Sequence, residues 1–140
     1  MSVGYLLDTN VVSEVRKRNG NLFVREWLDL VPGPILYLSS LTVGEIRRGV
    51  ELRRRKDPAQ AMVLETWLHM LRREFSDRII PLTSDVAEEW GRLSAIRPLP
   101  TVDGMIAATA RVNGWTLVSR NTKDFEGIGL SVLNPFEPLR

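Results

Sequence analysis

The sequence predicts an α/β domain in which helices flank a mostly parallel β-sheet. Short apolar runs recur along the chain, and segments with helical periodicity lie between them. No internal repeat, low-complexity segment or linker interrupts the 140 residues, so one domain is expected over residues 1–140. A hydrophobic fraction of 44% at this length is enough for a core that needs no disulfide or metal staple.

Five apolar runs are the expected strands. The first is VGYLL (residues 3–7), and the second is ILYLSS (35–40), which follows a Pro-Gly-Pro turn signal. A third run of the same kind is WTLVS (115–119). Two weaker runs complete the set, at residues 78–82 and 130–133.

Three segments between these runs have helical patterns. Apolar residues recur at i, i+3, i+4, i+7 and i+11 in Leu64, Trp67, Leu68, Leu71 and Phe75, which places them on one helix face. Residues 85–95 form a second helical pattern, with Asp85 and Glu88 at capping-box spacing. Residues 103–114 form a third, which ends at Gly114 as many helices do.

Composition excludes several kinds of site. The chain has no cysteine, which removes disulfides, thiol nucleophiles and cysteine-based zinc sites. Its one histidine, His69, would have to serve any Ser-His-Asp triad, so acid–base chemistry is expected to use carboxylates, lysine or metal-bound water. The N-terminus lacks the features of a signal peptide and no run is long enough to cross a bilayer, so we expect a cytoplasmic protein without membrane association.

Four acidic residues occupy positions where α/β domains bind ligands. In open sheets the ligand lies beyond the carboxyl ends of the strands. Asp8 directly follows the first strand, Glu45 lies early in the helix after the second, and Asp124 follows residues 115–119 after a short polar stretch. Asp103 begins a helix and lies on its apolar stripe, so its carboxylate should face the protein.

Each of these acids also has a purely structural interpretation. Asp8 or Asn10 could cap a helix, and Thr42 with Glu45 fits a capping box. Asp103 suits a helix N-terminus through the macrodipole, and Asp124 could be an exposed turn residue. Taken singly, Glu45 and Asp124 favour the structural interpretation, whereas Asp8 is evenly balanced.

Taken together, the four acids favour a metal site. If they converge, each pair of carboxylates about 4 Å apart repels by roughly 4 kcal/mol at an effective dielectric near 20. A divalent cation offsets that repulsion, and a set of oxygen ligands selects Mg²⁺ or Mn²⁺ over zinc. Such a site suits hydrolysis of phosphodiester bonds.

A basic segment follows Glu45 on the same expected helix. The net charge is only +2, but six cations fall between residues 47 and 56. A solvated helix face and a phosphate-binding face are about equally compatible with this pattern. The candidate phosphate contacts are Arg47, Arg48, Arg53 and Arg54.

Four segments together resemble a known family. They are LLDTNVVSE (6–14), SSLTVGEIRRGV (39–50), LPTVDGMIAATA (99–110) and LVSRNTKDFEGIGLSVLNPF (117–136), in the family's order. The chain resembles the PIN-domain ribonucleases, and within them the VapC/FitB-like toxins of toxin–antitoxin pairs. Residues 52–98 match only as helices.

The resemblance implies a function and a set of site residues. The family's acidic set falls on Asp8, Glu45, Asp103 and Asp124, as catalytic residues and metal ligands, and its supporting polar positions fall on Asn10, Asn121 and Thr122. It implies an endoribonuclease that hydrolyses RNA with water activated by Mg²⁺ or Mn²⁺. It further implies a cognate small antitoxin that inhibits the enzyme, and a homodimer. Ser119 stands where the family commonly has threonine.

Other functions remain open from the residues themselves. A nucleic-acid or protein binding module could use the basic segment without turnover, and it would hold RNA equally well in EDTA. A haloacid-dehalogenase-like phosphatase also places an aspartate after its first strand, but it needs a second acid where this chain has Asn10. A receiver domain needs paired acids near the N-terminus, and only Asp8 is present there.

Overall fold

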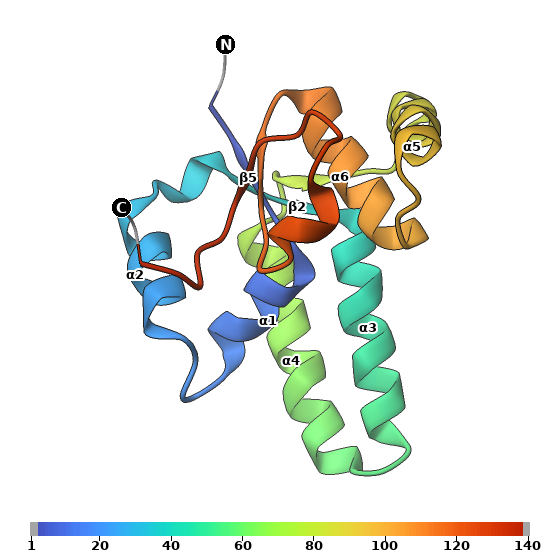
Figure 1. Ribbon diagram of the computed structural model, residues 1–140. Helices are drawn as coiled ribbons and strands as arrows, with labels where there is room; N and C mark the ends of the chain where they lie inside the picture. The colour runs from blue at the N-terminus through green and yellow to red at the C-terminus, as the bar shows by residue number, and fades with distance from the viewer. Residues whose placement is uncertain (1–2, 139–140) are drawn as a thin grey trace.

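Five parallel strands form one sheet in the computed structural model, which describes residues 3–138 (Figure 1). The order across the sheet is β3-β2-β1-β4-β5. All five predicted strands are present, each shorter than its apolar run: β1 (Tyr5–Leu7), β2 (Leu36–Ser39), β3 (Ile79–Ile80), β4 (Thr116–Val118) and β5 (Val132–Leu133). The predicted α/β class with a parallel sheet is therefore confirmed.

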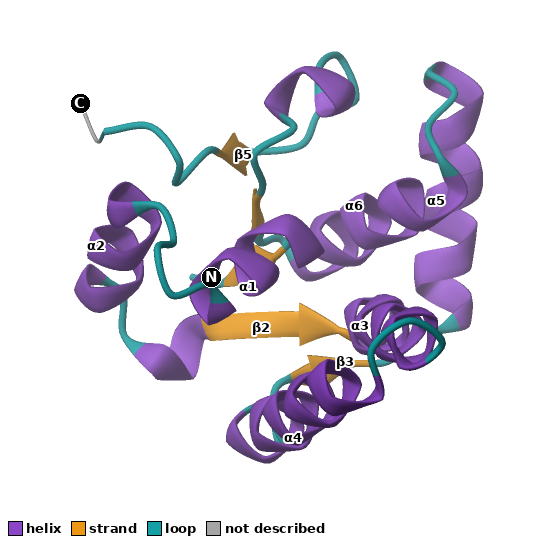
Figure 2. Ribbon diagram, turned by 90° about the horizontal axis from the view of Figure 1, so that it is seen from below, coloured by secondary structure: helices purple, strands orange, loops and turns teal. Residues whose placement is uncertain are grey.

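Helices cover both faces of the sheet (Figures 1 and 2). One face carries α1 (Thr9–Arg16), α2 (Leu22–Leu30), α3 (Ser40–Arg54) and α4 (Pro58–Glu74). The other carries α5 (Ser84–Ile96), α6 (Thr101–Asn113) and the 3₁₀ turn η2 (Thr122–Phe125). A second 3₁₀ turn, η1 (Gly33–Ile35), precedes β2 and takes up the predicted Pro-Gly-Pro turn. The helix α2 was not predicted from the sequence.

Strand alternation divides the core into two clusters. Leu7 and Val118 pack under α1 to α4, whereas their neighbours Leu6 and Leu117 pack under α5 and α6. Successive side chains of a strand point to opposite faces, so each strand contributes to both clusters. Burying a leucine stabilises the fold by about 1.5–3 kcal/mol, and these three-residue strands therefore anchor both helical layers.

Two predicted capping boxes are wrong. The side chain that caps α5 is Thr83, which accepts a hydrogen bond from the Val86 amide, so Asp85 lies inside the helix. The side chain that caps α3 is Ser39, which accepts from the Leu41 amide, and Thr42 is fully buried one turn later. Both helices begin earlier than the spacing indicated, because a hydroxyl side chain that precedes the expected cap accepts a hydrogen bond from an amide of the first turn.

The predicted end of α6 at Gly114 is confirmed. Gly114 has φ of 69°, a left-handed conformation that costs other residues free energy, and its amide donates to Ala110 and Arg111 carbonyls. The chain then returns directly into β4.

The topology brings the starts of two helices to one edge of the sheet. The carboxyl ends of β1 and β2 lead directly into α1 and α3, and β4 ends beside them. From this edge α3 and α4 extend side by side as a long hairpin, seen lengthwise in Figure 1 and end-on in Figure 2. Within residues 3–138, no helix is both long and apolar enough to span a membrane.

Candidate active site

Asp8 lies at the end of β1, where it is only 4% exposed. Its Oδ1 accepts a hydrogen bond from the Thr9 amide at 2.8 Å, and its Oδ2 accepts one from the Ser119 hydroxyl at 2.7 Å. Burial raises the pKa of the Asp8 carboxyl above its ordinary value of 3.8, and the nearby Glu45 charge adds to the rise. The two hydrogen bonds oppose this shift without cancelling it. Asp8 thus caps α1, and burial also makes its ionised form less favourable.

The Asp103 carboxyl feels the charges of the other three candidate acids. It lies half-buried in the first turn of α6, as its place on the apolar stripe predicts. Burial raises the pKa of its carboxyl, and the charges of Asp8, Glu45 and Asp124 raise it further. Carboxylates from four different elements therefore share one electrostatic environment.

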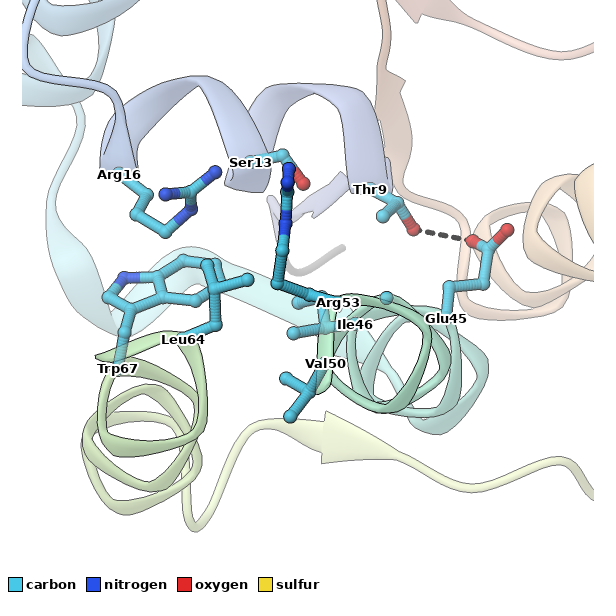
Figure 3. A pocket seen from close by; sticks show the side chains of 10 residues that line it. Thr9, Ser13, Arg16, Glu45, Ile46, Val50, Arg53, Leu64 and Trp67 are labelled. Carbon is cyan, nitrogen blue, oxygen red and sulfur yellow. Dashed lines mark hydrogen bonds between the residues drawn. The ribbon is translucent and has the colours of Figure 1, made fainter. Parts of the chain in front are cut away.

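Glu45 is tied to α1, not to the start of its own helix. The Thr9 hydroxyl lies 2.6 Å from Glu45 Oε1 and donates to it, as Figure 3 shows. Thr9 Oγ1 also lies 3.1 Å from the buried Thr42 hydroxyl. The interpretation of Glu45 as a capping partner of Thr42 is therefore wrong, and its exposed carboxylate is free to bind a ligand.

A small polar network surrounds Asp8. The Asn10 side-chain amide lies 3.4 Å from Asp8 Oδ2 and from Ser119 Oγ, and its oxygen accepts from the Arg120 amide at 3.3 Å. The Asn121 amide donates to Ser119 Oγ at 3.1 Å. These contacts join the end of β4 to the start of α1 and fix the direction of the Asp8 carboxylate.

The remaining predicted residues lie at the rim. Asp124 is exposed within η2, and its charge still acts on Asp103. Asn121 precedes η2 and is exposed, and Thr122 is partly buried at its start. In the described part of the chain, the side chains of these two residues make no hydrogen bond to the acids, so they stay candidates for supporting roles.

The sequence did not identify two residues that hydrogen-bond to the candidate acids, Thr9 and Ser119. Ser119 is completely buried and positions Asp8, and Thr9 positions Glu45. A signal was available for Ser119, because it follows β4 as Asp8 follows β1 and the two strands are neighbours. No comparable signal existed for Thr9, whose partner lies 36 residues away.

The donor set fits a hard divalent cation held partly through water. Among residues 3–138, no three acidic or histidine side chains are close enough together to ligate one ion directly. Mg²⁺ commonly keeps several waters and binds through one or two carboxylates, so this spacing suits it. The available donors are carboxylate, hydroxyl and amide oxygens, which favour Mg²⁺ or Mn²⁺ over zinc.

The basic segment divides into paired and unpaired arginines. Arg47 pairs with Glu51 at 3.0 Å and with Glu65, and Arg54 pairs with the same two acids at 3.1–3.3 Å. These contacts join α3 to α4, so Arg47 and Arg54 have a structural role that the sequence did not reveal. Arg48 and Arg53 are exposed, and neither forms an ion pair within residues 3–138.

Comparisons with known proteins agree with this architecture. Residues 5–129 match the family described as PIN domain. The chain is 33% identical over 141 residues to the VapC ribonuclease Y4jK of Sinorhizobium fredii, covering 95% of this chain and 98% of that protein. It is 32% identical over 139 residues to the toxin FitB of Neisseria gonorrhoeae, covering 94% and 97%. The fold superimposes on the crystal structure of FitAcB from Neisseria gonorrhoeae with a TM-score of 0.88 at 33% identity, covering 95% of this chain and 99% of that one.

Proposed function

Because the chain belongs to the PIN domain family, we propose that it is a metal-dependent endoribonuclease and the toxin of a toxin–antitoxin pair. The observation that carries the proposal is that the charges of Asp8, Glu45 and Asp124 all act on the half-buried Asp103 carboxyl and raise its pKa. The relatives named as a ribonuclease and as a toxin support the same activity.

The residues divide the chemical work among themselves. The carboxylates of Asp8, Glu45, Asp103 and Asp124 would hold the cation partly through bound water, and its positive charge would offset their mutual repulsion. A bound Mg²⁺ or Mn²⁺ lowers the pKa of a water molecule and stabilises the charge that develops on the phosphate oxygens.

Orientation of the acids comes from neutral groups. Ser119 and Thr9 direct the carboxylates of Asp8 and Glu45 toward the site. Asn10 contacts Asp8 and Ser119, and Asn121 and Thr122 lie at the rim, where they can support the site from the substrate side. No histidine takes part: His69 is exposed on α4, away from the sheet's carboxyl edge.

The proposal includes partners. RNA is the substrate, and Arg48 and Arg53 are its first candidate phosphate contacts, with Arg47 and Arg54 available only if their ion pairs open. A cognate antitoxin protein inhibits the enzyme by placing an arginine among the four carboxylates, since a planar guanidinium suits carboxylates better than an ammonium does. The active species is a homodimer in the cytoplasm, which forms a hetero-oligomer with the antitoxin.

Cleavage of RNA tests the proposal directly. Purified protein should degrade total RNA in Mg²⁺ or Mn²⁺ and stop in EDTA, and Asp8→Asn should abolish cleavage. The matched control is Asp29→Asn, which removes the same charge from an exposed site on α2 and should leave activity unchanged. Retention of RNA without cleavage, equally in Mg²⁺ and EDTA, would instead identify a binding module.

A further inference from the structure

A hollow of about 240 Å³ lies beside the acidic residues, between α1, α3 and α4 (Figure 3). Thr9 and Glu45, joined by their hydrogen bond, form the end nearest to the acidic residues. The rest of the polar lining comes from Ser13 and Arg16 on α1 and Arg53 on α3. The hollow is thus continuous with the proposed active site through Glu45.

Two guanidinium groups enter this hollow from different helices. Arg16 reaches in from α1 and Arg53 from α3, and Figure 3 shows both directed toward the region beside the Ser13 hydroxyl. Among residues 3–138, neither makes an ion pair, whereas Arg47 and Arg54 on the same hairpin are paired with Glu51 and Glu65. The charged lining of the hollow therefore consists of two guanidinium groups and the Glu45 carboxylate, which is hydrogen-bonded to Thr9. Its net positive charge favours an anion as the ligand.

A glycine, which has no side chain, lines part of the hollow. Gly49 lines it from the middle of α3, where glycine destabilises a helix relative to alanine. A Cβ at this position would meet no atom within 4 Å, so packing against the protein does not require the glycine. Its absence of a side chain leaves room for a ligand instead.

Structural roles explain only part of this arrangement. Arg16 lies in the last turn of α1, where a cation suits the helix dipole, and its guanidinium lies 5.9 Å from the centre of the Trp67 ring. These contacts do not involve Arg53, and they do not account for Gly49. An anionic ligand accounts for all three residues.

We propose that this hollow binds an RNA phosphodiester group next to the one that is cleaved. Arg16 and Arg53 contact the phosphate oxygens from two sides and the Ser13 hydroxyl donates a further hydrogen bond. The inference rests on the proposed function, because it assigns a second phosphate of the same substrate to a site that adjoins Glu45. It makes Arg16 and Arg53 substrate-binding residues that set the register of the RNA strand relative to the acidic site.

RNA binding across a range of salt concentrations tests the proposal without requiring cleavage. The probe is a fluorescent single-stranded RNA of mixed sequence, bound to the full chain in EDTA. Arg16→Gln and Arg53→Gln should each lower the slope of log K against log salt by about 0.7, the value for one lost phosphate contact on a single strand. Arg72→Gln, on the exposed part of α4 outside the hollow, removes the same charge and should leave the slope unchanged. Equal slopes for all four proteins, or an equal loss in Arg72→Gln, would overturn the proposal.

A second pair of variants tests the volume of the hollow without changing its charge. Gly49→Leu fills the hollow, whereas Gly44→Leu adds the same side chain to α3 at a position where a Cβ also meets nothing and which does not line the hollow. Gly49→Leu should weaken RNA binding and Gly44→Leu should not, with both proteins folded by circular dichroism. Equal binding by the two variants would contradict the proposal.

Cleavage measured in Mg²⁺ separates this proposal from the proposed function. If the wild type cleaves RNA while Arg16→Gln and Arg53→Gln bind and cleave as it does, the phosphate site is wrong and the ribonuclease assignment stands. If the wild type binds RNA with the expected slopes but does not cleave it in Mg²⁺ or Mn²⁺, the phosphate site stands and the ribonuclease assignment fails.

Discussion

At the scale of single residues, Asp103 connects stability to function. Its carboxyl pKa is raised above 3.8 by burial and by Asp8, Glu45 and Asp124, so the ionised form destabilises the folded protein. The sign follows from the linkage relation: the stabilising contribution is fully present below the unfolded pKa near 3.8 and is lost as pH rises through the higher folded pKa. Residues held at a cost to stability are typical of functional sites.

Asp103→Asn should therefore be more stable than the wild type at pH 7 in EDTA, and the advantage should shrink toward pH 4. In the described part of the chain the Asp103 side chain makes no hydrogen bond, so the amide loses no partner. Thermal unfolding at pH 4, 5.5 and 7 measures the effect, with Asp29→Asn as the control for charge. A variant that is less stable than the wild type at pH 7 would contradict the proposed clustering of the acids.

Ser119 is the residue on which the Asp8 geometry depends. Ser119→Ala removes the hydrogen bond to Asp8 Oδ2 and leaves buried polar groups unpaired, which should cost about 1–3 kcal/mol of stability. Without that hydrogen bond the pKa of Asp8 should rise further, and RNA cleavage should require higher pH. Urea denaturation and a pH–rate profile measure both effects. Ser131→Ala, at an exposed serine, should change stability by no more than about 0.5 kcal/mol, and a similar change in the two variants would argue against this role.

The sequence predicts the charged members of the site better than the neutral ones. An acid after a strand is visible because it interrupts an apolar run, as Asp8 does. Thr9 and Ser119 do not stand out from the apolar runs beside them in this way. Their contacts with Glu45 and Asp8 depend on the three-dimensional arrangement of the side chains. For the same reason the pairing of Arg47 and Arg54 with Glu65 was not foreseen, because it needs the register between α3 and α4.

At the scale of elements, glycine positions test the helix boundaries. Gly114→Ala should destabilise the protein by roughly 1 kcal/mol or more, because alanine is strained at φ of 69°. Gly91→Ala, inside α5 where a Cβ meets no atom within 4 Å, should stabilise it by up to about 1 kcal/mol. Chemical denaturation of the two variants provides the comparison. An increase in stability in Gly114→Ala would show that the end of α6 does not depend on a left-handed residue.

Element types were predictable where periodicity was strong, and boundaries were not. The stripe from Leu64 to Phe75 correctly predicted a helix, but α4 begins earlier, at Pro58. The helix α2 was missed although its apolar residues have helical periodicity, because it spans only nine residues and the pattern has little room to repeat. Neither capping box formed, because the spacing of two side chains does not show at which residue the helix begins.

At the scale of the whole molecule, the sheet topology places the candidate site at one edge, where the proposed inhibitor would also bind. An antitoxin arginine and a divalent cation would occupy the same carboxylates, so the binding of each should weaken the other by the same factor. Titration of the cognate antitoxin at low and high Mg²⁺ measures this coupling. An antitoxin affinity that does not depend on Mg²⁺ would indicate inhibition away from the acidic site.

The central claim is that the four carboxylates hold a divalent cation with which the protein cleaves RNA. The most direct measurement is a Mn²⁺ titration in which bound Mn²⁺ is followed by electron paramagnetic resonance and RNA cleavage is followed in the same samples. Binding and cleavage should rise with the same half-saturation in the wild type and in Asp29→Asn, and both should be lost in Asp103→Asn. RNA cleavage that persists in EDTA, or Mn²⁺ binding that is unaffected by Asp103→Asn, would contradict the account.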